Sequence, residues 1–162
     1  MEIIEPQPID LIEIVYLEKV CNFELKSRGW LSSDIYKQIT LEDLKNIFII
    51  KLNKLRLTGL IKINISDNYS DNSGNINSKC SKPLLIENIL IHPNWWSKNT
   101  GNTLLNFAED YARKKGFTSV RINAFSKNEY SIKLFEQLSY LKTYEFLPDN
   151  QNVPYYTFEK QL

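Results

Sequence analysis

Residues 84–105 read LLIENILIHPNWWSKNTGNTLL, and the way this stretch folds decides the rest of the interpretation. Apolar residues before Pro93 have the spacing of a strand, which proline ends because it has no backbone N–H for a ladder. After the polar residues 96–101, the apolar spacing becomes helical. The stretch therefore predicts a strand, a loop and a helix. A helix N-terminus that follows such a loop is a natural site for phosphate, although an ordinary strand–helix connection has the same pattern.

The rest of the chain predicts strands and helices in alternation. A β-α-β unit that extends from this stretch to residue 124 implies a parallel strand pair. Asp10, Thr40 and Asn128 are candidate helix caps, and Gly59 suggests a bulge or a close backbone approach. The predicted strands are 2–5, 47–52, 55–65, the one before Pro93, 118–124, 140–146 and 153–160; the predicted helices are 10–25, 30–39, the one after Gly101, and 129–139.

Composition limits the class of protein. A length of 162 residues with 43% hydrophobic content predicts one domain, residues 1–162, and a formal net charge of +1 gives no reason to expect a nucleic-acid partner. No apolar run is long enough for a membrane span, and the acidic, proline-containing N-terminus is not a signal peptide. Cys21, Cys80 and a single histidine predict no metal site and favour a reduced, cytoplasmic protein. Residues 66–82, rich in Ser, Asn and Gly, predict a mobile loop insertion.

The stretch HPNWWSKNTGNTLL resembles motif A of the GNAT superfamily of N-acetyltransferases, in which a strand ends near proline and Q/R-x-x-G-x-G/A precedes a helix. Gly101 matches the last glycine of that motif. Trp96 stands where Gln or Arg is usual, and Asn99 stands at the first glycine. Asn tolerates a positive φ better than most other residues, so the loop can keep its shape.

A second stretch, FSKNEYSIKLFEQLSY at residues 125–140, resembles motif B of the same family, N-x-x-A-x-x-L-Y-x-x-x-G-F. Asn128 and Leu134 match, whereas Ser131 replaces Ala and Phe135 replaces Tyr. The two motifs occur in the family's order. The resemblance implies the α/β (α+β) GNAT fold, a mixed, mostly antiparallel sheet of about six or seven strands that is splayed at a cofactor cleft and flanked by about four helices.

The resemblance also implies acetyl-CoA as cosubstrate. The pantetheine arm would pair like an added strand with backbone groups of residues 89–91, and the pyrophosphate would lie over the N–H groups of residues 97–103, where Gly101 allows close approach. Asn128 would hydrogen-bond the pantetheine arm, unless it only caps its helix. The expected cofactor-binding residues are Ile89, Leu90, Ile91, Trp96, Ser97, Lys98, Asn99, Thr100, Gly101, Asn102, Thr103, Asn128, Ser131 and Phe135.

Glu87 is the expected catalytic residue and a candidate substrate contact, because several small-amine acetyltransferases of the family carry Glu at this place as a base. It lies two positions before Ile89 on the same strand face, so it points toward the cleft if Ile89 does. The alternative is a structural ion pair with a neighbouring lysine. The family's usual acid is a tyrosine where this chain has Phe135, so water, Tyr130, Tyr140 or unaided thiolate departure would replace it.

The implied activity is direct acetyl transfer to a primary amine on a small molecule, amino acid, peptide or protein. Trp30 and Tyr36 are the further candidate substrate contacts. One alternative is a catalytically weak acyl-CoA-binding sensor or regulatory module, and another is an α/β phosphate binder that does not use CoA. No membrane partner is expected, and the chain would be a monomer or homodimer.

Overall fold

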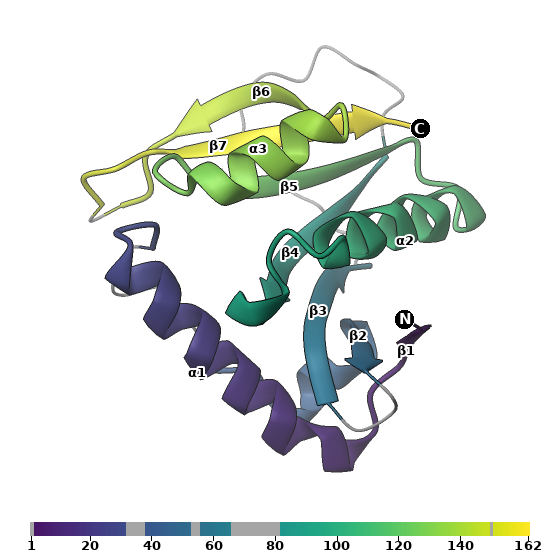
Figure 1. Ribbon diagram of the computed structural model, residues 1–162. Helices are drawn as coiled ribbons and strands as arrows, with labels where there is room; N and C mark the ends of the chain where they lie inside the picture. Colours follow the sequence, from purple (N-terminus) through teal and green to yellow (C-terminus); the bar gives the residue numbers. More distant parts are fainter. Residues whose placement is uncertain (1, 32–37, 53–55, 66–81, 150) are drawn as a thin grey trace.

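One seven-stranded sheet organises the described residues, with strand order β1-β2-β3-β4-β5-β7-β6 (Figure 1). The computed structural model describes residues 2–31, 38–52, 56–65, 82–149 and 151–162. In this part of the chain, every neighbouring strand pair is antiparallel except β4 with β5. The strands are β1 (Glu2–Ile4), β2 (Ile47–Leu52), β3 (Arg56–Asn64), β4 (Pro83–Ile91), β5 (Ser119–Phe125), β6 (Leu141–Phe146) and β7 (Tyr155–Gln161). The predicted mixed, mostly antiparallel sheet and its parallel β-α-β pair are confirmed.

The described helices are α1 (Leu11–Ser27), α2 (Thr100–Lys114) and α3 (Glu129–Gln137), with short 3-10 turns at Pro8–Asp10, Leu41–Asn46 and Pro93–Trp95. Gly116 has a φ of 77° just after α2, in the position that suits glycine. Asp10 was predicted to cap α1, but its carboxylate instead accepts from the Gln7 N–H and pairs with Lys51. The predicted helix over 30–39 falls mostly outside the described residues.

Two apolar clusters occupy opposite faces of the sheet. One joins α2 and α3 to alternate residues of β2–β5 and β7, with Leu104, Ala108 and Val120 fully buried. The other joins Ile14 and Leu17 of α1 to the opposite face of β2, β3 and β4. The helices on the two sides cover β4 in the middle of the sheet, where it forms with β5 the only parallel pair among the described strands.

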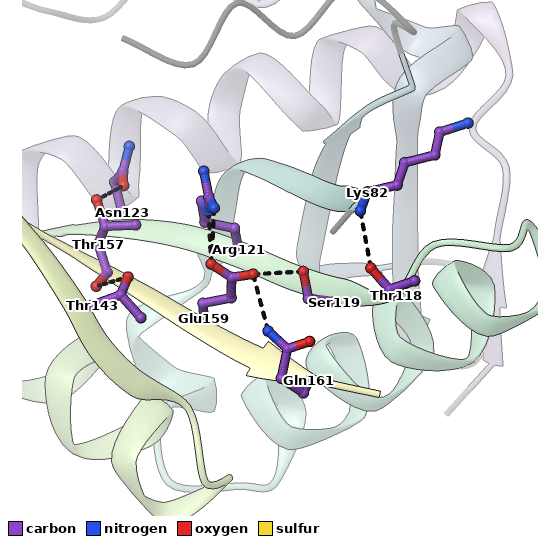
Figure 2. Close-up of polar contacts among 9 residues, drawn as sticks. All are labelled: Lys82, Thr118, Ser119, Arg121, Asn123, Thr143, Thr157, Glu159 and Gln161. Carbon is purple, nitrogen blue, oxygen red and sulfur yellow. Dashed lines mark hydrogen bonds and ion pairs between the residues drawn. The ribbon is translucent and has the colours of Figure 1, made fainter. Parts of the chain in front are cut away.

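The face of β5 and β7 that points away from α2 and α3 is polar (Figure 2). Arg121 lies opposite Glu159 in the ladder, and its guanidinium pairs with that carboxylate at 2.9 Å. Ser119 donates to the same carboxylate at 2.6 Å, and Thr157 donates to Asn123 at 2.8 Å. Cross-strand polar pairs of this kind provide hydrogen-bond partners for the buried polar groups of this face.

The described helices include none that is both long and apolar enough to cross a membrane. The predicted loop insertion at 66–82 lies outside the described residues except for its last residue, Lys82, and Cys80 and Tyr36 are outside them as well. Cys21 is buried on α1, and burial raises the pKa of its thiol to about 12, so this cysteine is unreactive at neutral pH.

Candidate active site

A cavity of about 430 Å³ opens where the C-terminal half of β4 separates from β5. The two strands pair only from Pro83 with Ser119 to Ile86 with Ile122, and Figure 1 shows them diverging beyond that point. The cavity is lined from α1, β3, β4, β5, α3 and the ends of β6 and β7. It therefore lies at the splay that the resemblance to the GNAT fold implied.

The free edge of β4 offers fewer backbone groups than residues 89–91 suggested. The N–H of His92 donates to Thr58 on β3, and antiparallel alternation then turns the backbone of Leu90 toward β3 as well. Leu90 is therefore wrongly placed among the residues whose backbone would face the cleft. Ile89 and Ile91 have the orientation that faces the open edge.

The carbonyl of Ile91 already has donors from this chain. The indole N–H of Trp96 donates to it at 2.9 Å, and the Cys21 thiol donates at 3.2 Å. The expectation that backbone groups of residues 89–91 pair with the pantetheine arm therefore does not extend to the Ile91 carbonyl. An extended ligand arm along this edge would have the backbone of Ile89 and the N–H of Ile91 to pair with.

A β-bulge in β4 changes the direction of Glu87. Lys62 of β3 pairs with Asn88, and the next residue Ile63 pairs with Ile86, so Glu87 is an extra residue without an opposite partner. Ile86, before the bulge, belongs to the apolar cluster that joins α2 and α3 to the sheet. Ile89, after the bulge, packs against the same cluster. Glu87 instead meets Lys62 on the α1 side. The expectation that Glu87 and Ile89 share a face is wrong, because regular alternation ends at the bulge.

Glu87 nevertheless lines the cavity. Its carboxylate lies 3.0 Å from the Lys62 ammonium, and its side chain is 39% exposed. Lys62 also contacts Asp43 at 2.8 Å, and this hydrogen bond is the main reason that the pKa of Asp43 falls to about 2. Burial by itself would lower the pKa of Lys62, but its two carboxylate partners raise it. Glu87 therefore lies in the cavity, as a catalytic base would, and also forms the lysine ion pair of the structural alternative.

The predicted phosphate loop has the backbone of a tight turn. Asn99 has a φ of 63°, as expected for an Asn at a glycine position, and Ser97 also has a positive φ of 59°. The N–H groups of Ser97, Lys98 and Thr103 have acceptors within the chain. The N–H groups of residues 100–102 belong to the first turn of α2. N–H groups in the first turn of a helix have no acceptor within that helix. These three groups are the ones that fit an anion.

Gly101 is buried, and it has a packing role that the sequence did not indicate. A Cβ at this position would lie 2.7 Å from a methyl carbon of Leu134 and 3.2 Å from one of Ile91. The glycine therefore lets α2 pack closely against α3 and β4. Gly59 similarly permits close approach of β3 to Thr100 and Leu104, beside the predicted bulge.

Trp96 is part of an aromatic stack that bridges three elements. Its ring lies 6.0 Å from that of Trp30, after α1, and 5.2 Å from that of Tyr130 on α3. The Arg28 guanidinium lies 5.1 Å from the Trp30 and Trp96 rings. Lys98 lies outside the stack, 5.0 Å from the ring of Trp95. A residue that departs from the family motif thus ties the loop to both sides of the cleft.

Asn128, Ser131 and Phe135 all line the cavity from α3. The side-chain oxygen of Asn128 accepts from the Ser131 N–H at 3.1 Å, so Asn128 caps α3 and also faces the cleft. Phe135 is 3% exposed and packs edge-on against Phe158. Position 135 therefore belongs to the core and to the cavity wall together.

The tyrosines differ in their access to the cavity. Tyr140 is buried beyond Phe135, and burial with the nearby Glu109 carboxylate raises its pKa well above the usual range. Tyr130 lies by the loop, and its hydroxyl accepts from the Ser97 N–H at 3.4 Å. Tyr155 lines the main cavity, and burial raises its pKa, so its hydroxyl stays protonated at neutral pH. Sequence patterns gave no signal for Tyr155.

Two further charged residues in the cavity wall were missed from the sequence, Glu18 of α1 and Lys62 of β3. Each looks like an ordinary polar position in an amphipathic element, and only the fold brings them beside Glu87. Of the expected substrate contacts, Trp30 and Glu87 line the cavity, whereas Tyr36 lies outside the described residues. Within the described part of the chain, no cluster of three His, Cys, Asp or Glu side chains has the arrangement of a metal site.

Comparisons with known proteins agree with this geometry. The family model described as acetyltransferase (GNAT) family matches residues 11–140. No curated protein sequence shows a significant match. Among solved structures, a GNAT-family acetyltransferase from Listeria monocytogenes has 16% identity and a TM-score of 0.73, covering 99% of this chain and 94% of that one.

Two other structures are similar. The putative acetyltransferase yncA from Salmonella typhimurium, with its cofactor acetyl-CoA, has 15% identity and a TM-score of 0.71, covering 99% of this chain and 92% of that one. An N-acetyltransferase from Staphylococcus aureus has 15% identity and a TM-score of 0.70, with 99% and 97% coverage. At these identities the likeness establishes the fold.

Proposed function

The chain belongs to the GNAT family of acetyltransferases, and from that premise we propose that it transfers an acetyl group from acetyl-CoA to a primary amine. The observation that carries the proposal is the cavity at the β4–β5 splay, which has open backbone groups at one wall and the Glu87 carboxylate at another. A thioester arm and an amine that enter this cavity from its two sides would meet between α3 and β4.

The residues present fit acetyl-CoA in three places. The edge of β4 at Ile89 has the backbone orientation for an extended arm, and the first turn of α2 supplies N–H groups for phosphate. Asn128 and Ser131 face the same space from α3. When bound, acetyl-CoA supplies a thioester carbonyl that an amine can attack.

In the proposed reaction the amine nitrogen forms a bond to the acetyl carbon, the carbon–sulfur bond breaks, and the sulfur leaves as a thiolate. The Glu87 carboxylate, directly or through water, takes the proton that the amine loses. A backbone N–H at the open edge of β4 stabilises charge on the carbonyl oxygen. Tyr155, which is protonated in the cavity wall, donates a proton to the leaving thiolate in this proposal, because Phe135 has no hydroxyl to do so.

Cofactor binding is tested by thermal unfolding. Ligands that bind only the folded state raise the melting temperature by mass action. At a concentration about 100 times the Kd, CoA or acetyl-CoA should raise it by roughly 5–10 °C for a domain of this size. ATP at the same concentration should give a much smaller shift. An equal shift with ATP would favour the phosphate binder that does not use CoA.

Phe135→Tyr tests how the thiolate leaves. Phe135 lines the cavity, so a hydroxyl added to its ring is expected near the sulfur. If departure of the thiolate limits the rate, turnover should rise modestly, and the gain should grow as the pH falls. The check is a steady-state comparison across pH, with CoA binding measured in parallel.

A large loss of activity in Phe135→Tyr, with CoA binding preserved, would mean that the new hydroxyl points into the core toward Phe158. The absence of any turnover in the unaltered chain, again with CoA bound, would instead favour the sensor or regulatory module. The missing hydroxyl at position 135 is the observation behind that second candidate.

A further inference from the structure

Glu18 carries an unused carboxylate oxygen in the wall of the active-site cavity. The residue lies on α1, lines the cavity, and is only 4% exposed. One oxygen accepts from the Ile39 N–H at 3.3 Å. The other oxygen is buried and has no hydrogen-bond partner in the described structure. A buried acceptor without a donor is costly, so this oxygen calls for a donor that the described residues do not supply.

The charged groups near Glu18 do not supply that donor. The Lys62 ammonium also lines this cavity, but its ion pairs are with Asp43 and Glu87. Burial raises the pKa of Glu18, and the negative charge of Asp43 adds to this effect. Three carboxylates thus surround one ammonium on this side of the cavity. The imbalance favours a cationic ligand.

Aromatic residues form a large part of the remaining wall, which also contains aliphatic residues and the polar residues Asn88, Asn123, Asn128 and Ser131; the aromatic residues include Trp30, Phe125, Phe146 and Tyr155. Such a wall suits a methylene chain, and aromatic faces also attract ammonium groups. Glu87 and Glu18 come from different elements, β4 and α1, so the cavity has two separate anionic positions. A ligand that donates a hydrogen bond to each of these two carboxylates through an amine carries two nitrogens.

We infer that the acceptor is an aliphatic diamine, which presents one nitrogen for acetylation beside Glu87 and places its second, cationic nitrogen on the free oxygen of Glu18. This inference rests on the proposed acetyl transfer to an amine. Glu18 is then a residue of substrate specificity. It takes no part in the bond changes, because its role is to hold the nitrogen that does not react.

The test compares each diamine with the monoamine of equal length: putrescine with n-butylamine, and cadaverine with n-pentylamine. In the full chain with acetyl-CoA, kcat/KM for the better diamine should exceed that of its monoamine by about 10- to 100-fold, the range for a charge-assisted hydrogen bond. In Glu18→Gln this preference, taken as the ratio of the two kcat/KM values, should fall to about threefold or less. Glu136→Gln, an exposed change on α3 outside the cavity, should keep the full preference.

A binding measurement separates this inference from the proposed function. Titration calorimetry of the same amines, with and without CoA, reports the preference without any turnover. If no amine is acetylated, the proposed function fails, and the calorimetry still decides the role of Glu18. Equal binding of diamines and monoamines by the unaltered chain, or a diamine preference that survives in Glu18→Gln, would overturn the inference and favour an aromatic monoamine or a peptide N-terminus.

Discussion

Glu87→Gln should lower kcat by roughly 10²–10⁴-fold at neutral pH, the usual contribution of a general base. Gln keeps the shape and the hydrogen bond to Lys62 but cannot accept the amine proton. Glu87 lies in the cavity wall and is exposed enough to reach a ligand or its water. The measurement is steady-state turnover with any accepted amine, together with the CoA-induced thermal shift, which should be unchanged.

Glu145→Gln is the matched control for this substitution. Glu145 is also an exposed strand glutamate, paired with Lys142 at 2.9 Å, but it lies on β6 outside the cavity. Its substitution should leave kcat unaltered. An unchanged rate and pH–rate profile in Glu87→Gln would assign Glu87 to the ion pair with Lys62 alone, and the base would then have to be sought elsewhere.

Gly101→Val should destabilise the protein by about 1–3 kcal/mol, the usual cost of overpacking, and should remove the thermal shift with CoA. The added Cβ would lie 2.7 Å from Leu134, so α2 must move away from α3. That movement would displace the first turn of α2, whose N–H groups are the proposed phosphate contacts. Urea unfolding gives the stability, and thermal unfolding with and without CoA gives the binding.

Asn106→Val controls for the β-branched side chain itself, because Asn106 is exposed on the same helix. It should cost only the helix-propensity difference and leave the CoA shift intact. Gly101→Ala adds the same Cβ beside Leu134 and should also lower CoA binding. Adding Leu134→Val should recover part of that binding, because the shorter side chain makes room. A full CoA shift in Gly101→Val would contradict the placement of the phosphate site at this turn.

The fold could be predicted because its signals are local. Pro93 follows a strand and Gly116 follows a helix. A compact apolar run marks β2, and alternating apolar residues mark β3 and β5, each within one or two residues of the observed bounds. The assignment of Asp10 failed because a distant ion pair with Lys51 and the preceding turn compete for its carboxylate. Helix-capping propensity depends on nearby residues and does not include such distant contacts.

The site was harder to predict than the fold. Motif positions located the loop and Asn128, since the backbone of this region follows from its turn residues. The direction of Glu87 was predicted wrongly, because a bulge depends on the pairing with β3 and leaves no mark in the sequence of β4. Glu18 and Tyr155 reach the cavity from α1 and β7, elements that lie outside both motifs in the sequence.

The bulge at Glu87 makes the length of β4 part of the site. Loss of the Glu87 codon would restore a regular ladder, because Ile86 would still pair with Ile63 and Asn88 with Lys62, but the local bend and extra twist that a bulge gives a strand would be lost. The pairing of β4 with β5 ends at Ile86, directly before the bulge, so a straighter strand would change the opening of the cavity although every side chain of the turn before α2 would still be present. Relatives that carry all these residues but lack this one extra position should therefore be treated as different in geometry, and gaps in this strand weigh more than substitutions.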